Sequence, residues 1–374
     1  MDFNLSEEQV LLKQNAARML ADTCPTDVVR QAEDDGRYAA DLWHDLSNLG
    51  WLGLGISQDG GGAGGTIFDQ MLLAEEFGRV LAPVPFVASN VVAAAAIEGS
   101  GNAQAIGRWL PPIASGSRIA TLAIAESDTL WDIDGITLAA TSDGDGYRLD
   151  GEKLFVLDGV FADDIVVGAR SSEGVVLAIV PADTPGVTVE RMDTISGDGQ
   201  ASIRFENTSV AADQVIAIGD AAEQALSRAV DHACLAHCGS MLGAAQVGMD
   251  MAVEYAKDRV QFGRAIGGFQ AIQHKLATMM KELESARAII YSTAWQYSLG
   301  NADSQAVSMA KAWMNDASDR SMWEAHQIHA GVAYMMEFDL QLYTRRCKSW
   351  EVLFGDTRHH RTQIGDALRA PVRP

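Results

Sequence analysis

The sequence has few cysteines, and their spacing does not match a disulfide framework. Among 374 residues, the only cysteines are Cys24, Cys234, Cys238 and Cys347, and no two of them form a Cys-x-x-Cys pair. Small secreted domains that depend on disulfides are much richer in cysteine. We therefore expect free thiols and a cytoplasmic protein.

Long apolar runs are also missing. No stretch reaches the roughly 18 apolar residues that a membrane helix needs. The first twenty residues carry acidic side chains where a secretory signal has basic ones. With 48% hydrophobic and 21% charged residues, the composition is that of a globular chain of two or three domains without a membrane partner.

Positive charge is scarce and unevenly placed. The chain has 28 Lys and Arg residues against 50 Asp and Glu residues, a net charge of −22. Such a chain repels polyphosphates at long range, so nucleic acid is not an expected partner. Residues 251–374 carry 15 basic and 13 acidic side chains, whereas residues 1–250 carry 13 and 37. A site for an anion is therefore expected late in the chain.

Hydrophobic periodicity divides the chain into helical, β and helical parts. Ser6 and Gln9 form a capping-box pattern that predicts a helix from about residue 6. Further helical patterns cover 40–49, 66–82, 86–99, 103–115 and, with bundle-like spacing, 267–299. Between 118 and 216 the segments are short, β-branched and separated by Asp-Gly turns.

These patterns predict an α+β multidomain fold. We expect an N-terminal α-helical domain over 1–117, a middle antiparallel β-barrel or sandwich domain over 118–216, and a C-terminal four-helix bundle over 217–374.

Two weaker motifs favour structural interpretations. Gly60, Gly62 and Gly65 satisfy a dinucleotide-binding pattern, but no alternation of strand and helix follows them, so we expect a helix-connecting loop. Cys234 and Cys238 are spaced to share a helix face, but their segment is small and apolar, which is typical of buried thiols. We therefore expect no metal site.

Residues 259–270 form a cationic loop that opens into the long helix. The sequence there is RVQFGRAIGGFQ. An arginine and free amides at a helix start suit a pyrophosphate. A solvated loop would explain Arg259 and Arg264 but not the aromatic residues Phe262 and Phe269.

The longer pattern R-x-Q-F-G-x-x-I-x-x-F-Q-x-x-Q-x-x-L-A-x-M, from residue 259 to 279, resembles the signature of the acyl-CoA dehydrogenase family. The likeness extends to the opening DFNLSEEQ, to YRLDGEKLFV and to residues 327–331, which resemble the family's Q-I-x-G-G turn. The resemblance implies FAD bound between subunits, with the β-domain holding its ring. It also implies that the neighbouring subunit's nucleotide contacts Arg259, Phe262, Phe269, Gln270, Gln327, Ile328, His329, Ala330 and Gly331, while Asp356 and Thr357 approach the near subunit's flavin.

The resemblance fails at the catalytic base. The family's usual glutamate position is occupied by Phe354, and an alternative glutamate position by Ala233. Asp231 matches the acid of the family's Asp-x-x-Arg element, which helps to hold CoA, but Cys234 replaces the arginine. Asp231 is therefore a CoA contact, a displaced base or a carboxylate on a solvated helix face, and Asp356 is a further candidate base.

The expected ring pocket also departs from the family. Ala125-Glu126-Ser127-Asp128 lacks the family's threonine and its Gly-Ser turn, and Phe155-Val156-Leu157 replaces a Trp-Ile-Thr strand whose hydroxyl donates to the flavin. Small apolar residues over 238–249 indicate a bulky or long acyl chain.

Taken together, these departures resemble the small (β-type) subunits of heteromeric α2β2 acyl-CoA dehydrogenases of the pimeloyl-CoA or steroid side-chain type. The resemblance implies FAD-dependent α,β-dehydrogenation of an acyl-CoA in fatty acid or steroid side-chain degradation, with electron-transferring flavoprotein as acceptor. The base comes from a paralogous partner chain, Asp356 or Asp231, and we rank the partner first. A homodimer or homotetramer, and a non-catalytic subunit that binds acyl-CoA or completes a partner's FAD site, remain alternatives.

Overall fold

The computed structural model describes residues 5–127, 131 and 133–369. The chain divides into two compact units, each assembled from segments far apart in the sequence. One comprises Met1–Val29, Met71–Ala82 and Cys234–Pro374, and the other Arg30–Gln70 and Pro83–Ala233. The three domain boundaries predicted from the sequence stay a prediction.

The second unit contains the helices that precede the sheet. They are α3 (Ala40–Asn48), the start of α4 (Ile67–Val80), the π-helix η1 (Val87–Ala93), α5 (Ala94–Gly99) and α6 (Ala103–Ala114). All lie within predicted helical segments, whereas α2 (Thr26–Asp35) was not predicted. The Asn90 side chain on η1 donates to the carbonyls of Leu52 and Ile113, which ties the loop after α3 to the end of α6.

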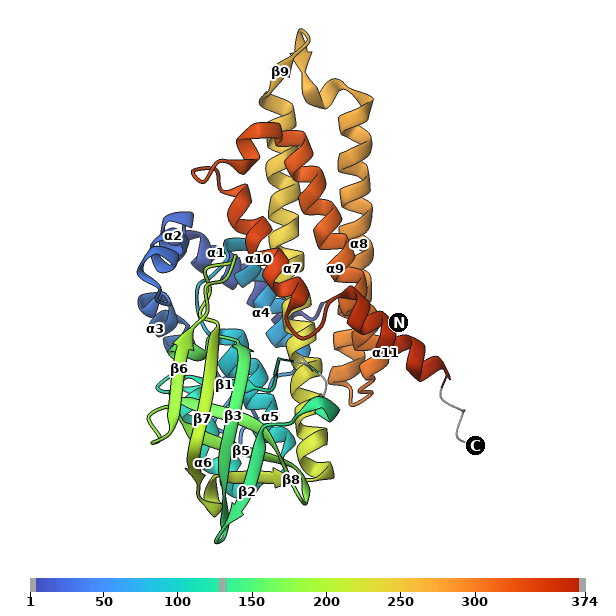
Figure 1. Cartoon of the computed structure of the whole chain (residues 1–374). Coiled ribbons are helices and arrows are strands. Elements are labelled where there is room, and N and C mark those ends of the chain that lie inside the picture. Colours follow the sequence, from blue (N-terminus) through green and yellow to red (C-terminus); the bar gives the residue numbers. More distant parts are fainter. Residues whose placement is uncertain (1–4, 128–130, 132, 370–374) are drawn as a thin grey trace. The chain divides into compact units, whose positions relative to one another are not determined.

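One eight-stranded sheet and the start of α7 (Asp220–Asp258) also belong to this unit (Figure 1). Its strands are β1 (Ala120–Ala123), β2 (Ala139–Asp143), β3 (Gly146–Val156), β4 (Asp164–Ser171), β5 (Gly174–Pro181), β6 (Val187–Arg191), β7 (Ala201–Val210) and β8 (Val215–Ile218). The strand order is β6-β7-β3-β2-β4-β5-β8, and β1 also pairs with β4. Most neighbouring strands pair antiparallel, as predicted, whereas the pairs β1–β4 and β2–β4 are parallel. In both parallel pairs the chain passes through β3 before it reaches β4, so the connection is a crossover rather than a hairpin.

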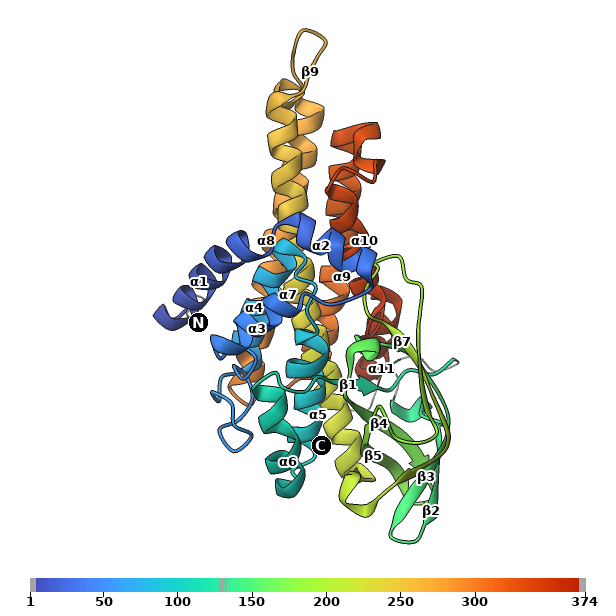
Figure 2. The same cartoon turned by 90° about the vertical axis from the view of Figure 1, so that its left-hand side faces the viewer.

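The first unit is helical. It contains α1 (Glu7–Thr23), α7 (Asp220–Asp258) from Cys234 onward, α8 (Gln270–Ser298), α9 (Ser304–His329), α10 (Leu340–Val352) and α11 (Thr357–Arg369). Both views show α7, α8, α9 and α10 running side by side (Figures 1 and 2). Met279, Leu283, Ala286 and Ile290 form the buried stripe of α8, as predicted. Met280, next to Met279 in the sequence, lies outside this stripe and is exposed.

The small residues over 238–249 pack helices rather than line a pocket. A Cβ atom on Gly239 would lie 2.6 Å from the Met71 carbonyl oxygen of α4, and one on Gly243 would lie 2.0 Å from that of Glu75. These glycines let the backbones of α4 and α7 approach closely. The reasoning from this segment to a bulky acyl chain was therefore wrong.

The glycine loop over residues 60–65 also has a packing role. A Cβ atom on Gly62 would lie 2.2 Å from the Ile56 carbonyl oxygen, and one on Gly65 would lie 2.6 Å from that of Leu54. The loop connects α3 to α4, as the sequence predicted.

Candidate functional site

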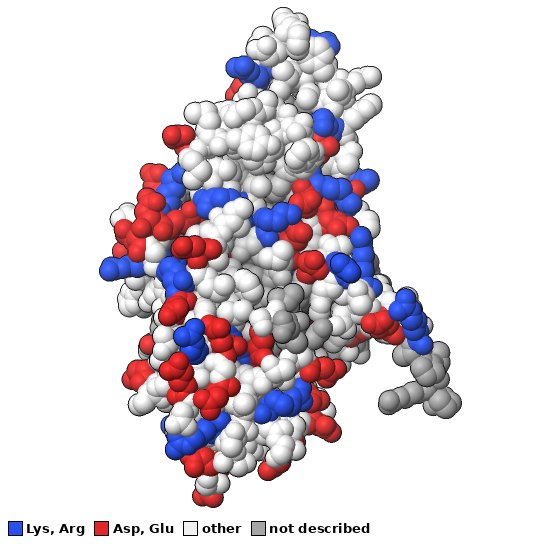
Figure 3. All heavy atoms as spheres, viewed as in Figure 1, with Lys and Arg blue, Asp and Glu red and all other residues white. Residues whose placement is uncertain are grey.

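The cationic loop is a short hairpin between α7 and α8. Strands β9 (Val260–Gln261) and β10 (Arg264–Ala265) pair antiparallel, and the Phe262 ring at the tip is 92% exposed. The Arg264 guanidinium stacks on the Phe269 ring, 4.1 Å from its centroid. Arg259 is exposed, and among the residues that the structure describes no carboxylate pairs with it. The hairpin thus projects from the helical unit with an exposed cation and an apolar tip. Few other charged atoms surround it (Figure 3).

Residues 327–331 end α9 beside the same end of α7. The His329 ring lies 4.6 Å from that of Tyr255, four residues before Arg259, and its Nδ1 lies 2.8 Å from the Ala325 carbonyl oxygen. Gln327 and Gly331 are exposed. Ala330 has φ 57° and ψ −139°, a conformation that strongly favours glycine. The structure therefore brings the two predicted nucleotide-binding segments to one end of the helical unit.

The turn over residues 353–356, between α10 and α11, is held by α9. Phe354 is 2% exposed, has φ 58° and stacks on His237. The Lys311 ammonium donates to the carbonyl of Gly355 at 3.4 Å. Lys311 and Gln327 lie about 24 Å apart along α9, from the helical rise of 1.5 Å per residue. The turn and the predicted nucleotide-binding segments are therefore separate places on the chain.

Asp356 and Thr357 have local structural roles at the start of α11. Asp356 is exposed, and its Oδ1 accepts from the His359 amide at 2.7 Å, which makes it the N-cap of the helix. Thr357 Oγ1 donates to Asp316 on α9 at 3.0 Å. Asp356 therefore already has a partner that holds it at the surface.

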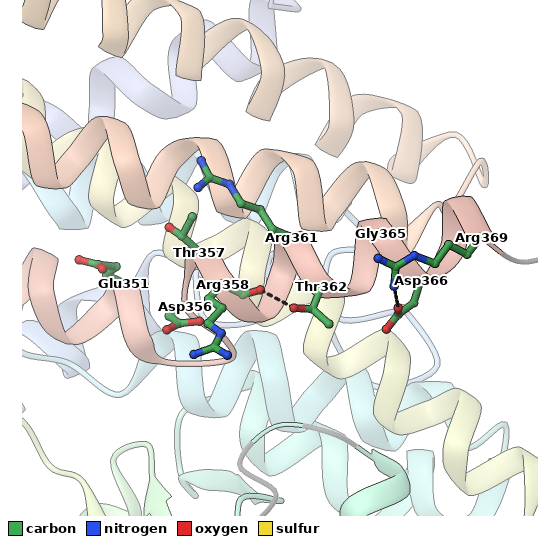
Figure 4. A pocket seen from close by; sticks show the side chains of 9 residues that line it. All are labelled: Glu351, Asp356, Thr357, Arg358, Arg361, Thr362, Gly365, Asp366 and Arg369. Atoms are coloured by element: carbon green, nitrogen blue, oxygen red, sulfur yellow. Dashed lines mark hydrogen bonds and ion pairs between the residues drawn. The ribbon is translucent and has the colours of Figure 1, made fainter.

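A shallow groove follows one side of α11 (Figure 4). Its volume is about 590 Å³. Arg361 reaches Asp316 at 2.6 Å, and Arg369 reaches Asp366 at 3.1 Å. Three arginines and three acidic residues line it, so the groove favours neither sign of charge; all its lining residues are Glu351, Asp356, Thr357, Arg358, Arg361, Thr362, Gly365, Asp366 and Arg369.

Asp231 and Ala233 lie on α7 in the other unit. Both are buried, and Asp231 is 8% exposed. The interpretation of Asp231 as a carboxylate on a solvated helix face was therefore wrong, because water does not surround it. Its role in CoA binding or catalysis stays a prediction.

The β-domain places Glu126 in a buried ion pair. Its Oε1 lies 2.6 Å from Lys153 Nζ, and the carboxylate also accepts from the amides of Thr137 and Leu138. Burial lowers the pKa of Lys153 to about 8, against the effect of Glu126. Asp128, part of the same predicted motif, lies outside the described residues. The Glu126 carboxylate thus holds β3 in place through its ion pair with Lys153.

The Phe155-Val156-Leu157 segment ends β3 at a bulge. Phe155 has φ 53° and is exposed, whereas Val156 and Leu157 are buried. The Thr121 hydroxyl donates to the Leu157 carbonyl at 2.6 Å. The aromatic ring is thus accessible, but Leu157 offers no hydroxyl.

The four cysteines behave as buried core groups with free thiols. Burial raises the pKa of Cys238 to about 12, so the thiol is protonated at neutral pH. Cys234 Sγ donates to the Phe354 carbonyl at 3.7 Å. Nowhere in residues 5–127, 131 and 133–369 do three or more His, Cys, Asp or Glu side chains gather as a metal site would require. Within the same ranges, no helix is long and apolar enough to cross a bilayer.

Three family models match the chain in sequence order. They are "Acyl-CoA dehydrogenase, N-terminal domain" over residues 6–117, "middle domain" over 121–208 and "C-terminal domain" over 221–369. The chain belongs to the acyl-CoA dehydrogenase family. These flavoenzymes are oxidoreductases that use FAD, and the three-domain order predicted from the sequence is that of the family.

Known relatives match over nearly the whole length. "Probable acyl-CoA dehydrogenase YngJ" of Bacillus subtilis is 27% identical over 98% of this chain and 100% of its own. The fold is similar to a chain of the ChsE4-ChsE5 complex from Mycobacterium tuberculosis, with a TM-score of 0.92, 26% identity and all of both chains covered. It is also similar to a variant of the "Tcur3481-Tcur3483 steroid ACAD", with a TM-score of 0.89, 30% identity and 97% and 98% covered.

Sequence reasoning missed two buried polar clusters. One is centred on Lys311, and the other joins Glu75 of α4 to Lys13 of α1 and to Arg287 and Tyr291 of α8. In the sequence, each cluster is indicated only by a charged residue inside an apolar helical pattern. That pattern does not identify the residue with which the charge pairs.

Proposed function

We propose that this chain is a subunit of an FAD-dependent acyl-CoA dehydrogenase that works with a paralogous chain, and that the paralogous chain supplies the catalytic base. The observation that carries the proposal is Phe354, a buried phenyl ring at the place where the family resemblance expects a glutamate.

The reaction needs a base and a hydride acceptor. Dehydrogenation removes a proton from the carbon next to the thioester and a hydride from the following carbon, and a double bond forms between them. Bound FAD supplies the two-electron acceptor, and electron-transferring flavoprotein would take the electrons onward. The proton must go to a carboxylate that faces the substrate.

This chain offers no such carboxylate at the expected positions. Phe354 and Ala233 have no titratable group. Asp356 caps α11 at the surface. Asp231 remains as a buried carboxylate on α7, and we assign it to CoA rather than to proton transfer, because the Asp-x-x-Arg resemblance is to a CoA-holding element. A base from the partner chain therefore accounts best for these positions.

The nucleotide-binding segments suit an anionic cofactor. Arg259 supplies an exposed guanidinium, Gln327 an exposed amide, and Gly331 a backbone with no atom within 4 Å of its missing Cβ. A cation, an amide and an open backbone are what a pyrophosphate requires. Because these residues lie about 24 Å along α9 from the residue that holds the 353–356 turn, we assign the two places to different flavins.

The relatives support a heteromeric assembly. Both similar structures named above bear two chain names, and one of them is described as a steroid enzyme. The exposed apolar tip at Phe262 is the kind of surface that a second chain covers. We therefore propose an α2β2 arrangement that acts on an acyl-CoA of the fatty acid or steroid side-chain class.

A non-catalytic subunit that completes a partner's FAD site is the second candidate. The β-domain favours it, because Glu126 is bound to Lys153 and Leu157 replaces a hydroxyl donor. In that case, a partner chain would hold the flavin ring of every working site.

Co-expression with paralogous acyl-CoA dehydrogenase chains of the same genome tests both candidates. The proposal predicts a heteromeric complex that contains FAD and oxidises acyl-CoA, whereas the chain alone does not. Turnover by a pure homo-oligomer would refute it. One FAD for each pair of chains, rather than one for each chain, would favour the second candidate.

A further inference from the structure

Lys311 is a lysine that the proposed chemistry does not use and that the fold buries completely. Its side chain on α9 has no exposed surface. Its Nζ atom lies 2.8 Å from Asn315 Oδ1, 2.9 Å from the Trp350 carbonyl oxygen and 3.0 Å from that of Glu351. All contacts belong to the helical unit.

The carbonyl groups around Lys311 are those that a helix end leaves unsatisfied. Trp350 and Glu351 are in the last turn of α10, where carbonyl oxygens lack amide partners within the helix. The end of a helix also carries partial negative charge, which favours a cation. Burial lowers the pKa of Lys311, while the nearby acidic groups and thiols oppose that shift. The ammonium group thus donates hydrogen bonds to carbonyl oxygens at the end of α10. These bonds offset the free-energy cost of removing the ammonium group from water.

The same ammonium reaches past the helix end into the turn that follows. The Gly355 carbonyl accepts from Lys311 Nζ and from Asn315 Nδ2, each at 3.4 Å. Lys311 therefore connects the last turn of α10 to the residue just before Asp356, the N-cap of α11.

The turn itself has a backbone that must be held. Phe354 has φ 58°, which is unfavourable for a residue with a large side chain, and Gly355 has φ 113°. A Cβ atom at Gly355 would lie 2.5 Å from the His359 ring and 2.8 Å from the His360 ring. The chain can follow this path only with glycine at that position.

We propose that Lys311 is a positioning residue whose ammonium group fixes the 353–356 turn in one conformation, with Phe354 turned inward and Asp356 held at the start of α11. The turn is then a fixed wall rather than a loop that delivers Asp356 to the interior. This inference goes beyond the proposed function, because it concerns this chain alone and does not require FAD or a partner.

Fluorine NMR of the full chain labelled with 4-fluorophenylalanine tests the proposal. Phe354→Leu identifies the Phe354 resonance, which the stacked His237 ring should shift. We expect one narrow Phe354 resonance in the unsubstituted chain. Lys311→Met should split or broaden it, and should raise amide exchange over residues 355–360 by about tenfold beyond any change in global stability. Lys311→Arg, which keeps the donors, should restore part of the single resonance.

Lys348→Met is the matched control. Lys348 is an exposed lysine of α10 that pairs with Asp319 and Glu351 through their carboxylates, so its loss should leave the Phe354 resonance unchanged. If Lys311→Met does not fold, Asn315→Ala removes the second donor to Gly355 and should show the same splitting at a lower population. An unchanged Phe354 resonance and unchanged local exchange in Lys311→Met, or in Asn315→Ala where only that variant folds, would overturn the proposal.

Discussion

The Phe354 ring stacks on the His237 ring, with centroids 5.7 Å apart and planes inclined by 28°. This contact fills the interior side of the 353–356 turn with two aromatic rings, one from the turn and one from α7. An aromatic stack of this kind contributes about 1 kcal/mol beyond its buried area. In this chain the turn contributes packing where the family resemblance expects a proton acceptor.

Phe354→Ala should lower the free energy of unfolding by about 3 to 5 kcal/mol, because it leaves a cavity in a buried site. Chemical denaturation checks this value. Phe155→Ala is the control, since Phe155 shares the residue type and a positive φ but is 36% exposed. Equal losses in the two variants would show that Phe354 is not packed as described.

Asp356→Asn should leave the turnover of the heteromeric complex nearly intact. An asparagine can also cap α11, so stability should change by only a few tenths of a kcal/mol, whereas Asp356→Ala should cost about 1 kcal/mol. Steady-state kinetics and denaturation separate these effects. A fall in turnover of several orders of magnitude in the asparagine variant would assign the catalytic base to Asp356.

Arg259→Ala should weaken FAD retention about tenfold or more, because a charge-assisted contact to pyrophosphate is lost. Flavin absorbance of the purified complex measures this retention. Arg264→Ala, on the same hairpin, removes a guanidinium that stacks on Phe269 and should have a smaller effect. Unchanged flavin content in the Arg259 variant would contradict the assignment of the hairpin.

Ala330→Gly should raise the free energy of unfolding by about 1 kcal/mol, since it relieves a backbone conformation that side chains rarely adopt. Thermal and urea unfolding both report the change. Ala312→Gly, inside α9, should instead cost about 1 kcal/mol, because glycine weakens a helix interior. A loss of stability in the Ala330 variant would disprove the strain.

Glu75→Gln should destabilise the chain by about 3 to 5 kcal/mol, because it removes the buried carboxylate that is the main partner of two half-buried cations. Glu75 lies 2.6 Å from both Lys13 and Arg287. Burial by itself raises the pKa of Glu75, but these cations hold it below the ordinary value of 4.5.

The lowered pKa of Glu75 sets a pH dependence. The unfolded chain takes up this proton first as the pH falls, so the stabilisation is present above the ordinary pKa of 4.5 and is lost as the pH falls through the folded-state pKa. In urea titrations at a series of pH values, Glu75→Gln should reduce the fall in the free energy of unfolding at acid pH. Glu284 is an exposed partner of Arg287. Glu284→Gln should therefore cost less than about 1 kcal/mol and should leave the loss of stability at acid pH unchanged.

The elements with strong local patterns were predictable from the sequence. The capping box at Ser6 and the spacing of α8 identified helices that the structure confirms. The ten residues of α2 were missed because they carry few apolar positions. The π-helix η1 was predicted only as part of a helix, because its apolar residues do not distinguish a π-helix from an α-helix.

Segments of the candidate site could be recognised in the sequence only where their residues are neighbours in the chain. Residues 259–270 and 327–331 are continuous motifs, and the structure places both at one end of the helical unit. Apart from Asn315, the partners of Lys311 are backbone carbonyls 39 to 44 residues away, which leave no trace in side-chain patterns. The N-cap role of Asp356 likewise follows from where α11 begins, which the sequence did not show.

Proton removal from the substrate tests the central claim most directly. The FAD-loaded chain alone and its complex with the paralogous partner would be incubated in deuterated water with short-chain, long-chain and steroid side-chain acyl-CoA thioesters, without oxygen. The account predicts that the complex exchanges the proton next to the thioester and bleaches its flavin, while the chain alone does neither. Exchange and bleaching by the chain alone would contradict it.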